Sequence, residues 1–387
     1  MIECFYICKE RISFITTTIT QNPSVQKVGF IGLGLIGGSI AKAIRLYYPD
    51  CCLIAFDKNK EALALALQDG TIDTICTSID HHFQDCAYIF LCAPIAYNAA
   101  YLHQLKGIIS PDCIITDVGS VKTSIHEEVA ALNLESQFIG GHPMAGSEKS
   151  GYTNAKAHLI ENAYYILTPT TAVSPEQLGT FRLFVESLHA LPLVLDYTEH
   201  DYVTGAISHL PHILASCLVN YVHKADDSQE LMKRLAAGGF KDITRIASSS
   251  PIMWQQICLK NRTNIIQILE DYINTIKEEK NAIEKEDETS LYSMFEESRD
   301  YRNSMPNHSL GPIKKQFALY CDIIDEAGGI ATIATILASN HISIKNIGIV
   351  HNREFEEGVL RIEFYEESAA CQASALLKKY RYVVYEI

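Results

Sequence analysis

The glycine-rich segment at residues 27–44, KVGFIGLGLIGGSIAKAI, most constrains how this chain can fold. It places Gly32, Gly34 and Gly37 in a G-x-G-x-x-G pattern directly after an apolar strand and at the start of a helix. In this context the first glycine permits a tight turn, the second lets the backbone approach a pyrophosphate, and the third allows close helix packing. The N–H groups of the helix N-terminus then face the phosphates. A glycine-rich turn can be only a turn, but its place after a strand predicts a dinucleotide site.

An acidic residue at the end of the second predicted strand supports a dinucleotide site. Asp57 stands in IAFDKN, about 20 residues after the last glycine of the pattern, where a carboxylate accepts hydrogen bonds from the adenosine ribose hydroxyls. Its charge would repel a 2′-phosphate, so we expect NAD rather than NADP, although the neighbouring Lys58 could partly offset that repulsion. The residues predicted to bind the cofactor are Gly32, Gly34, Leu35, Ile36, Gly37, Asp57, Ala93 and Pro94.

Composition narrows the class of protein and its partners. The chain has 387 residues, of which 48% are hydrophobic and 20% charged, and this is enough for two or three domains with cores of their own. A net charge of −14 argues against nucleic acid or an anionic membrane as a partner. The longest apolar runs are shorter than the roughly 20 residues that span a bilayer, so no membrane segment is predicted. Twelve cysteines without a C-x-x-C pair indicate reduced thiols and a cytoplasmic protein.

The hydrophobic pattern divides the chain into four stretches. Residues 1–26 lack the features of a secretory signal and form an extension whose role the pattern does not indicate. Residues 27–196 alternate β-branched runs with helical periodicity, which predicts an α/β, Rossmann-type domain with a parallel sheet. Residues 197–305 carry only helical spacing and predict an all-helical domain, whose surplus apolar surface favours a twofold homodimer. Residues 315–387 follow a linker and predict a βαββαβ ferredoxin-like unit.

Six motifs, in order between residue 27 and about residue 303, together resemble the prephenate dehydrogenase family. They are GLGLIGGSIAKAI, CAPI, DVGSVK, GGHPMAGSEKSG, SHLPH and GGFKDITRIASSSPIMW. The resemblance implies NAD(P)-linked oxidative decarboxylation of prephenate to 4-hydroxyphenylpyruvate in tyrosine biosynthesis, or of arogenate in some lineages. The C-terminal unit resembles an ACT domain, a regulatory module that binds an amino acid. This implies feedback by tyrosine at the DEAGGI turn, through Asp325, Gly328 and Gly329.

A histidine between a glycine pair and a proline, His142 in FIGGHPMAG, is the candidate base. Oxidising a ring carbinol requires a group that takes the hydroxyl proton, and a neutral histidine with a reference pKa of about 6.5 suits that role. His142 follows the predicted strand QFIGG, at the sheet edge where open α/β folds bind ligands. A lone histidine is more often merely satisfied in a turn. The motif context favours the catalytic role.

Ser120 in TDVGSVK has two possible roles that can coexist. It is placed to cap a helix beginning at Val121, which would contribute about 1 kcal/mol. By the resemblance, Ser120 is also catalytic, because it bridges the histidine and the nicotinamide or the substrate hydroxyl. Lys122 is interpreted as a surface or phosphate-proximal charge rather than a catalyst.

Prephenate is a dianion, so an acidic protein needs a guanidinium group in its pocket. Arg245 in DITRIA is the candidate, and the resemblance assigns it to a substrate carboxylate. The resemblance brings five further residues to the substrate: His212, Ser147, Glu148, Lys241 and Asp242. His209 and His212 are three residues apart, but no third ligand motif accompanies them, so no metal is predicted. Trp254 is by periodicity more typical of a core residue.

Three other functions remain open. An arogenate dehydrogenase would need only one changed pocket contact. A dehydrogenase of hydroxy acids or phosphogluconate-like substrates would share the Rossmann and helical layout but not the HPMAG and TRIA motifs. A non-catalytic sensor of nucleotides and amino acids would need neither His142 nor Ser120.

Overall fold

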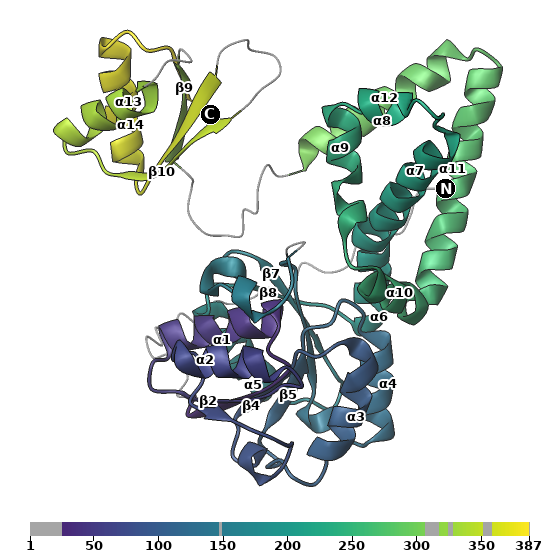
Figure 1. Ribbon diagram of the computed structural model, residues 1–387, viewed down its shortest axis with the longest axis vertical. Helices are drawn as coiled ribbons and strands as arrows, with labels where there is room; N and C mark the ends of the chain where they lie inside the picture. Colours follow the sequence, from purple (N-terminus) through teal and green to yellow (C-terminus); the bar gives the residue numbers. More distant parts are fainter. Residues whose placement is uncertain (1–24, 147–148, 306–316, 324–327, 351–357, 387) are drawn as a thin grey trace, which may run out of the picture. The chain divides into compact units, whose positions relative to one another are not determined.

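The computed structural model describes residues 25–146, 149–305, 317–323, 328–350 and 358–386 (Figure 1). The chain divides into two compact units, Met1–Gly311 and Pro312–Ile387, and each is described by itself. The predictions for residues 1–24 and for Ser147, Glu148 and Asp325 lie outside the described residues.

A parallel sheet with strand order β3-β2-β1-β4-β5 forms the first half of the larger unit. Its strands are β1 (Lys27–Ile31), β2 (Cys52–Phe56), β3 (Thr74–Ile75), β4 (Tyr88–Leu91) and β5 (Ile114–Asp117). The connecting helices are α1 (Leu35–Tyr47), α2 (Lys60–Gln68), α3 (Ile95–Leu105) and α4 (Thr123–Ala131). Alternate residues of β1 enter two different cores, because Phe30 packs with Ile40 of α1 while Ile31 packs with Leu102 of α3. Helices therefore cover both faces, as a buried parallel sheet requires.

A three-stranded sheet of order β6-β7-β8 extends this domain. It consists of β6 (Ile139–Pro143), β7 (Tyr164–Pro169) and β8 (Leu191–Val194), and a parallel bridge from Ile115 to Phe138 joins it to β5. The β6 and β7 strands pair antiparallel, so the sheet is not parallel throughout as predicted. The cause lies in the connection between them, whose described residues, 144–146 and 149–163, contain only short 3-10 turns and no crossover helix. The α5 helix (Pro175–Ser187) supplies that crossover next, and β8 accordingly runs parallel to β7.

Only helices follow in the described part of the chain up to Ser304. They are α6 (Tyr197–Thr204), α7 (Leu210–Ala225), α8 (Leu231–Leu235), α9 (Gly238–Thr244), α10 (Pro251–Lys260), α11 (Arg262–Glu284) and α12 (Glu288–Ser304). A π-helical turn, Gly205–His209, joins α6 to α7 into one continuous helix, Tyr197–Ala225. By length and composition alone this helix could cross a membrane, which the shorter apolar runs of the sequence did not indicate, but a core helix of a soluble protein meets the same criterion.

The smaller unit has the predicted βαββαβ order. Its elements are β9 (Phe317–Ile323), α13 (Gly329–Ser339), β10 (Ile344–Val350), β11 (Gly358–Phe364), α14 (Glu367–Lys379) and β12 (Val384–Glu386). The sheet has the order β10-β11-β9-β12 and its strand pairs are antiparallel. Its core joins Leu319 and Leu360 of the sheet to Leu337 of α13 and Leu377 of α14. The predicted fold class is therefore confirmed.

Candidate active site

The glycine-rich turn between β1 and α1 leaves space for a ligand. Gly32 has φ +98°, and a Cβ there would approach the Ala93 backbone N to 2.6 Å. A Cβ on Gly37 would lie 2.6 Å from the Gly32 carbonyl oxygen, whereas one on Gly34 would meet nothing within 4 Å. Helix α1 has no side-chain cap and no acidic residue in its first turn, which contains Leu35 and Ile36. Its N–H groups are thus open to an anion, and the turn fits a dinucleotide.

Asp57 is held directly beside this turn. Its carboxylate oxygens accept hydrogen bonds from the Leu33 N–H (2.5 Å) and the Asn59 N–H (2.6 Å). The Lys58 ammonium lies over the Tyr97 ring, 4.1 Å from its centre, which gives that charge a partner of its own. Ala93 and Pro94 follow β4 on the same sheet edge, and Pro94 precedes the first residue of α3.

Replacing Asp57 with Ser is expected to shift the cofactor preference toward NADP. The substitution removes the negative charge that would face a 2′-phosphate and leaves Lys58 beside the site. The kcat/KM values for NAD and NADP, measured on both proteins, check this. A wild-type protein that already uses NADP better than NAD would refute our interpretation of Asp57.

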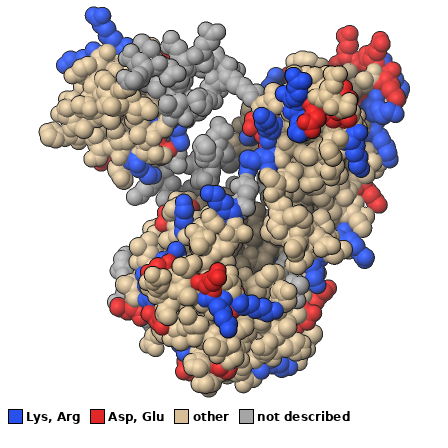
Figure 2. All heavy atoms as spheres, in the orientation of Figure 1, with Lys and Arg blue, Asp and Glu red and all other residues tan. Residues whose placement is uncertain are grey.

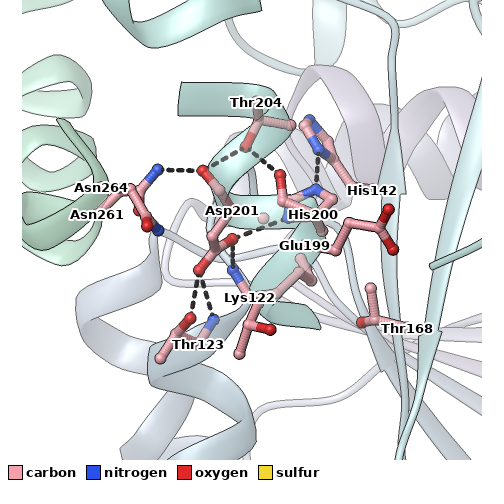
Figure 3. A network of polar contacts seen from close by, with 12 residues as sticks. Lys122, Thr123, His142, Thr168, Glu199, His200, Asp201, Thr204, Asn261 and Asn264 are labelled. Atoms are coloured by element: carbon pink, nitrogen blue, oxygen red, sulfur yellow. Dashed lines mark hydrogen bonds and ion pairs between the residues drawn. The ribbon is translucent and has the colours of Figure 1, made fainter. Parts of the chain in front are cut away.

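His142 lies within β6 and not after it as predicted, because β6 continues to Pro143 in its pairing with β7. Its Nδ1 lies 2.8 Å from Nε2 of His200 in α6 (Figure 3). Burial lowers the pKa of His142 well below its usual value, and the nearby His200, Lys122 and His209 lower it further. The imidazole is therefore neutral near pH 7, as a general base must be.

Asp201 joins this histidine pair to helix α4. Its carboxylate lies 2.8 Å from His200 Nδ1 and accepts hydrogen bonds from the N–H groups of Lys122 (2.7 Å) and Thr123 (2.8 Å). Burial alone would raise the pKa of Asp201, but these hydrogen bonds outweigh that effect and hold the pKa below its usual value. The carboxylate is thus ionised at the N-terminus of α4, a favourable place for a negative charge.

Ser120 is not the N-cap of α4, contrary to the prediction. The helix begins at Thr123, with Lys122 in the N-cap position, and the carboxylate of Asp201 satisfies its first N–H groups. The reason is tertiary, since a residue about 80 positions away supplies the cap that a neighbouring hydroxyl was expected to supply. Ser120 remains half-buried in the turn that follows β5.

Lys122 is not a surface charge, because its side chain is fully buried. Its ammonium group forms an ion pair with Asp117 and donates a hydrogen bond to the Gly141 carbonyl (2.6 Å). Asp117 also accepts a hydrogen bond from the Gly141 N–H (3.2 Å). This pair ties the end of β5 to the residue that precedes His142 and so fixes the backbone beneath the imidazole.

His212 and Trp254 form a second group, on α7 and α10. Their rings stack with centroids 3.6 Å apart, and His212 Nδ1 lies 3.1 Å from the Ser208 carbonyl oxygen. Because a carbonyl can only accept, Nδ1 carries the hydrogen and Nε2 of a neutral His212 is left as an acceptor. Trp254 is half-buried against this histidine, which differs from the core position that periodicity favoured. His209 is buried, with Nδ1 3.0 Å from the amide nitrogen of Asn261.

The remaining predicted substrate residues lie on neighbouring helices. Lys241 and Asp242 are exposed on α9, and Arg245 is exposed at the start of the turn Arg245–Ser248. Both elements pack against α7, the helix that carries His212. In the smaller unit, Gly328 has φ +101° and Gly329 begins α13.

The predicted residues of the sheet come together at one edge. The strands β1, β4, β5 and β6 run in the same direction, so the segments that follow Ile31, Leu91 and Asp117 open on the edge where His142 lies. His200 and Asp201 were not predicted from the sequence. They stand in DYTEHDYV, which lacks the glycine and proline residues that mark the other motifs, and the residues they contact are far away in the chain.

The family model described as the nucleotide-binding domain of prephenate dehydrogenase matches residues 40–192, and the model described as its dimerization domain matches residues 196–297. The chain belongs to the prephenate dehydrogenase family. The prephenate dehydrogenase of Bacillus subtilis (strain 168) is 40% identical over 338 residues, which is 87% of this chain and 91% of that protein.

Solved structures agree with this family. A prephenate dehydrogenase from A. aeolicus, in complex with hydroxyphenyl propionate and NAD+, has a TM-score of 0.70 and 33% identity, and the match covers 74% of this chain and 100% of that one. An arogenate dehydrogenase from Synechocystis has a TM-score of 0.65 and 31% identity over 72% of this chain and 99% of that one. The predicted family, the oxidoreductase class and NAD as cofactor are confirmed.

Proposed function

We propose that this chain oxidises and decarboxylates prephenate to 4-hydroxyphenylpyruvate, with His142 as the base. The observation that carries the proposal is the neutral, hydrogen-bonded imidazole of His142 on the sheet edge shared with the open glycine-rich turn. The N-terminus of α1 would hold the pyrophosphate of NAD and Asp57 the adenosine ribose. When bound there, NAD would supply the acceptor for the hydride that leaves the carbinol carbon of the ring.

The roles of the protein residues follow from the chemistry of the substrate. As hydride leaves, His142 Nε2 takes the hydroxyl proton, and Ser120 on the neighbouring turn orients that hydroxyl. The ring carboxylate then leaves as carbon dioxide, its electrons form the aromatic ring, and the ring oxygen takes the proton back from His142. The net change is loss of carbon dioxide and of one hydride. The chain therefore needs a base and firm positioning rather than a dedicated acid.

The activity is tested by incubating the purified chain with prephenate and NAD while NADH is followed by its fluorescence. Arogenate is the matched second substrate, because an arogenate dehydrogenase of known structure is among the relatives of this chain. NADH production from prephenate at the higher kcat/KM is the expected result. A higher kcat/KM with arogenate would reassign the substrate, and no NADH from either would overturn the proposed reaction.

Arg245 is proposed to bind a carboxylate of the substrate, near His212 on the adjoining helix α7. Arg245→Gln is expected to raise the KM for prephenate roughly 10- to 150-fold, which corresponds to the free energy of one hydrogen bond to a charged group. The fall in kcat should be much smaller. Steady-state kinetics at saturating NAD measure both. The matched control is Arg234→Gln on the exposed face of α8, which should leave KM unchanged. An unchanged KM in Arg245→Gln would move the carboxylate site elsewhere.

The pocket is also proposed to contain Lys241, Asp242, Ser147 and Glu148, which the family motifs associate with its mouth. Lys241 and Asp242 are exposed on α9 beside α7, which supports their position near Arg245. Surface charges of this kind contribute little to stability, so their expected role is recognition of the substrate.

A homodimer is proposed from the apolar surface of the helices. A groove of about 620 Å³ runs between α7, α9 and α11, lined by Leu214, Leu218, Tyr221, Ile243, Tyr272 and Ile276. Tyr221 is 70% exposed and Ile243 66% exposed. Figure 2 shows uncharged side chains over much of the visible face of these helices. An exposed apolar surface of this kind is typical of a subunit interface, and a twofold partner would cover it.

A cytoplasmic location is proposed with the same function. The ten cysteines that the structure describes are all free thiols, which is typical of a reducing compartment.

Tyrosine is proposed to regulate the enzyme through the smaller unit. The proposal is supported by the N-terminus of α13, which begins at Gly329 after Gly328 and could receive an amino-acid carboxylate, with Asp325 preceding them in the chain. We expect tyrosine to inhibit the full chain, with a coupling of about 1 to 3 kcal/mol, or roughly 5- to 150-fold in affinity. A chain ending at Ser304 should lose this inhibition and keep its turnover.

The measurement is a tyrosine titration of both proteins, with leucine as the control amino acid. If the full and shortened chains respond equally, tyrosine acts at the active site as a product analogue, and the smaller unit has another role.

A further inference from the structure

Two residues that no motif singles out stand directly behind His142. His200 and Asp201 are both fully buried, and they come from α6, whereas His142 comes from β6. The contacts run in series, from His142 Nδ1 to His200 Nε2 (2.8 Å) and from His200 Nδ1 to the Asp201 carboxylate (2.8 Å), as Figure 3 shows.

The series has only one consistent placement of hydrogens when both histidines are neutral. The ionised carboxylate of Asp201 can only accept, so His200 must carry its hydrogen on Nδ1. His200 Nε2 is then an acceptor, and His142 must donate to it from Nδ1. The remaining nitrogen of His142, Nε2, is left without a hydrogen. A general base needs this free lone pair.

We propose that Asp201 and His200 are positioning residues that hold His142 in the tautomer with a free Nε2. This rests on the proposed function of His142 as the base. When His142 takes the substrate proton, its Nδ1–H continues to donate to His200, and the carboxylate behind His200 favours the positive charge. The proton then returns to the ring oxygen, so the buried residues hold it without passing it to solvent.

The surrounding contacts hold Asp201 in place. Its carboxylate also accepts a hydrogen bond from the Thr123 hydroxyl (2.6 Å), and its backbone carbonyl accepts one from the Asn261 amide (2.7 Å). The charged or titratable groups that act on His142 are His200, Lys122 and His209, and Asp201 and Asp117 stand behind them. Every one of these side chains is buried, so solvent does not select the tautomer.

The direct test reads the tautomer without turnover. Nitrogen-15 NMR of the full chain with labelled histidine distinguishes a protonated from an unprotonated ring nitrogen, and the His142→Asn spectrum identifies the His142 signals. We expect Nε2 of His142 to be unprotonated at pH 7.5. In Asp201→Leu the acceptor that keeps a hydrogen on His200 Nδ1 is removed, so the series can reverse and a hydrogen should appear on Nε2 of His142. A wild-type Nε2 that carries a hydrogen would overturn the proposal, even if the protein oxidises prephenate.

Kinetics provide the second test. Asp201→Leu should lower kcat by roughly 10² to 10⁴, the range for a base in the wrong tautomer, with KM for prephenate and NAD nearly unchanged. His200→Gln can still accept from His142 through its amide oxygen and should retain about tenfold more activity than His200→Leu. The control is Asp112→Asn, an exposed aspartate before β5 that lies outside the series, and it should keep wild-type kcat. A folded Asp201→Leu protein with kcat within about threefold of wild type would overturn the assignment, as would an equal loss in Asp112→Asn.

Discussion

Replacing His142 with Asn is expected to lower turnover of prephenate by roughly 10² to 10⁴, the usual contribution of a positioned general base. Asn retains a side chain that can accept a hydrogen bond, but it cannot take a proton at neutral pH. The glycine-rich turn and Asp57 are not altered, so the dissociation constant for NAD should change little. NADH production gives the turnover, and calorimetric titration with NAD gives the affinity.

The control for this substitution is His103→Asn, since His103 is an exposed histidine of α3 and should leave turnover unchanged. The pH dependence gives an independent check. Burial lowers the pKa of His142 below 6.5, so the neutral, active form persists through neutral pH and kcat/KM should fall only as pH drops through that lowered pKa. Turnover of His142→Asn near the wild-type value would end the assignment of the base.

Replacing Lys122 with Met is expected to lower the free energy of unfolding by about 3 to 5 kcal/mol. The ammonium group is the counter-ion of the buried Asp117, and its removal would leave a carboxylate charge without a partner in the core. The contact to the Gly141 carbonyl would be lost as well. Urea denaturation followed by circular dichroism measures the change.

The double variant Lys122→Met with Asp117→Asn is the matched control. The amide oxygen at position 117 can still accept a hydrogen bond from the Gly141 N–H, but neither member of the pair leaves a buried charge. Part of the lost stability should therefore return. If the free energy of unfolding of Lys122→Met lies within about 1 kcal/mol of the wild-type value, the pair contributes no more to stability than a surface salt bridge.

The features that the sequence predicted well are local ones. The glycine pattern, the alternating strands of the first domain and the helical periodicity after Tyr197 each depend on neighbours a few positions apart. The position of His142 near the end of a strand was predicted for the same reason, since QFIGG before it is a short and largely apolar run, although the strand continues through His142 to Pro143.

The features that were missed depend on distant parts of the chain. Nothing near Lys122 indicates that its ammonium group meets Gly141, and nothing near Ser120 indicates that Asp201 caps the helix that follows. The antiparallel pairing of β6 and β7 depends on the absence of a crossover helix from the described part of the connection between them, and local sequence patterns do not indicate the direction of the next strand. Tertiary contacts decide such points, so they become visible only in the folded chain.

The continuous helix Tyr197–Ala225 limits how this part of the chain can change in length. Its first turns carry His200 and Asp201, which lie behind His142, its middle carries His212, and its second half lines the apolar groove. Inserting one residue into a helix turns everything beyond it by about 100°, so a single insertion would swing His212 and the groove away from their partners. A substitution leaves this rotational relationship unchanged, whereas an insertion or deletion shifts it. We therefore expect the number of residues from His200 to His212 to be the same in every active relative.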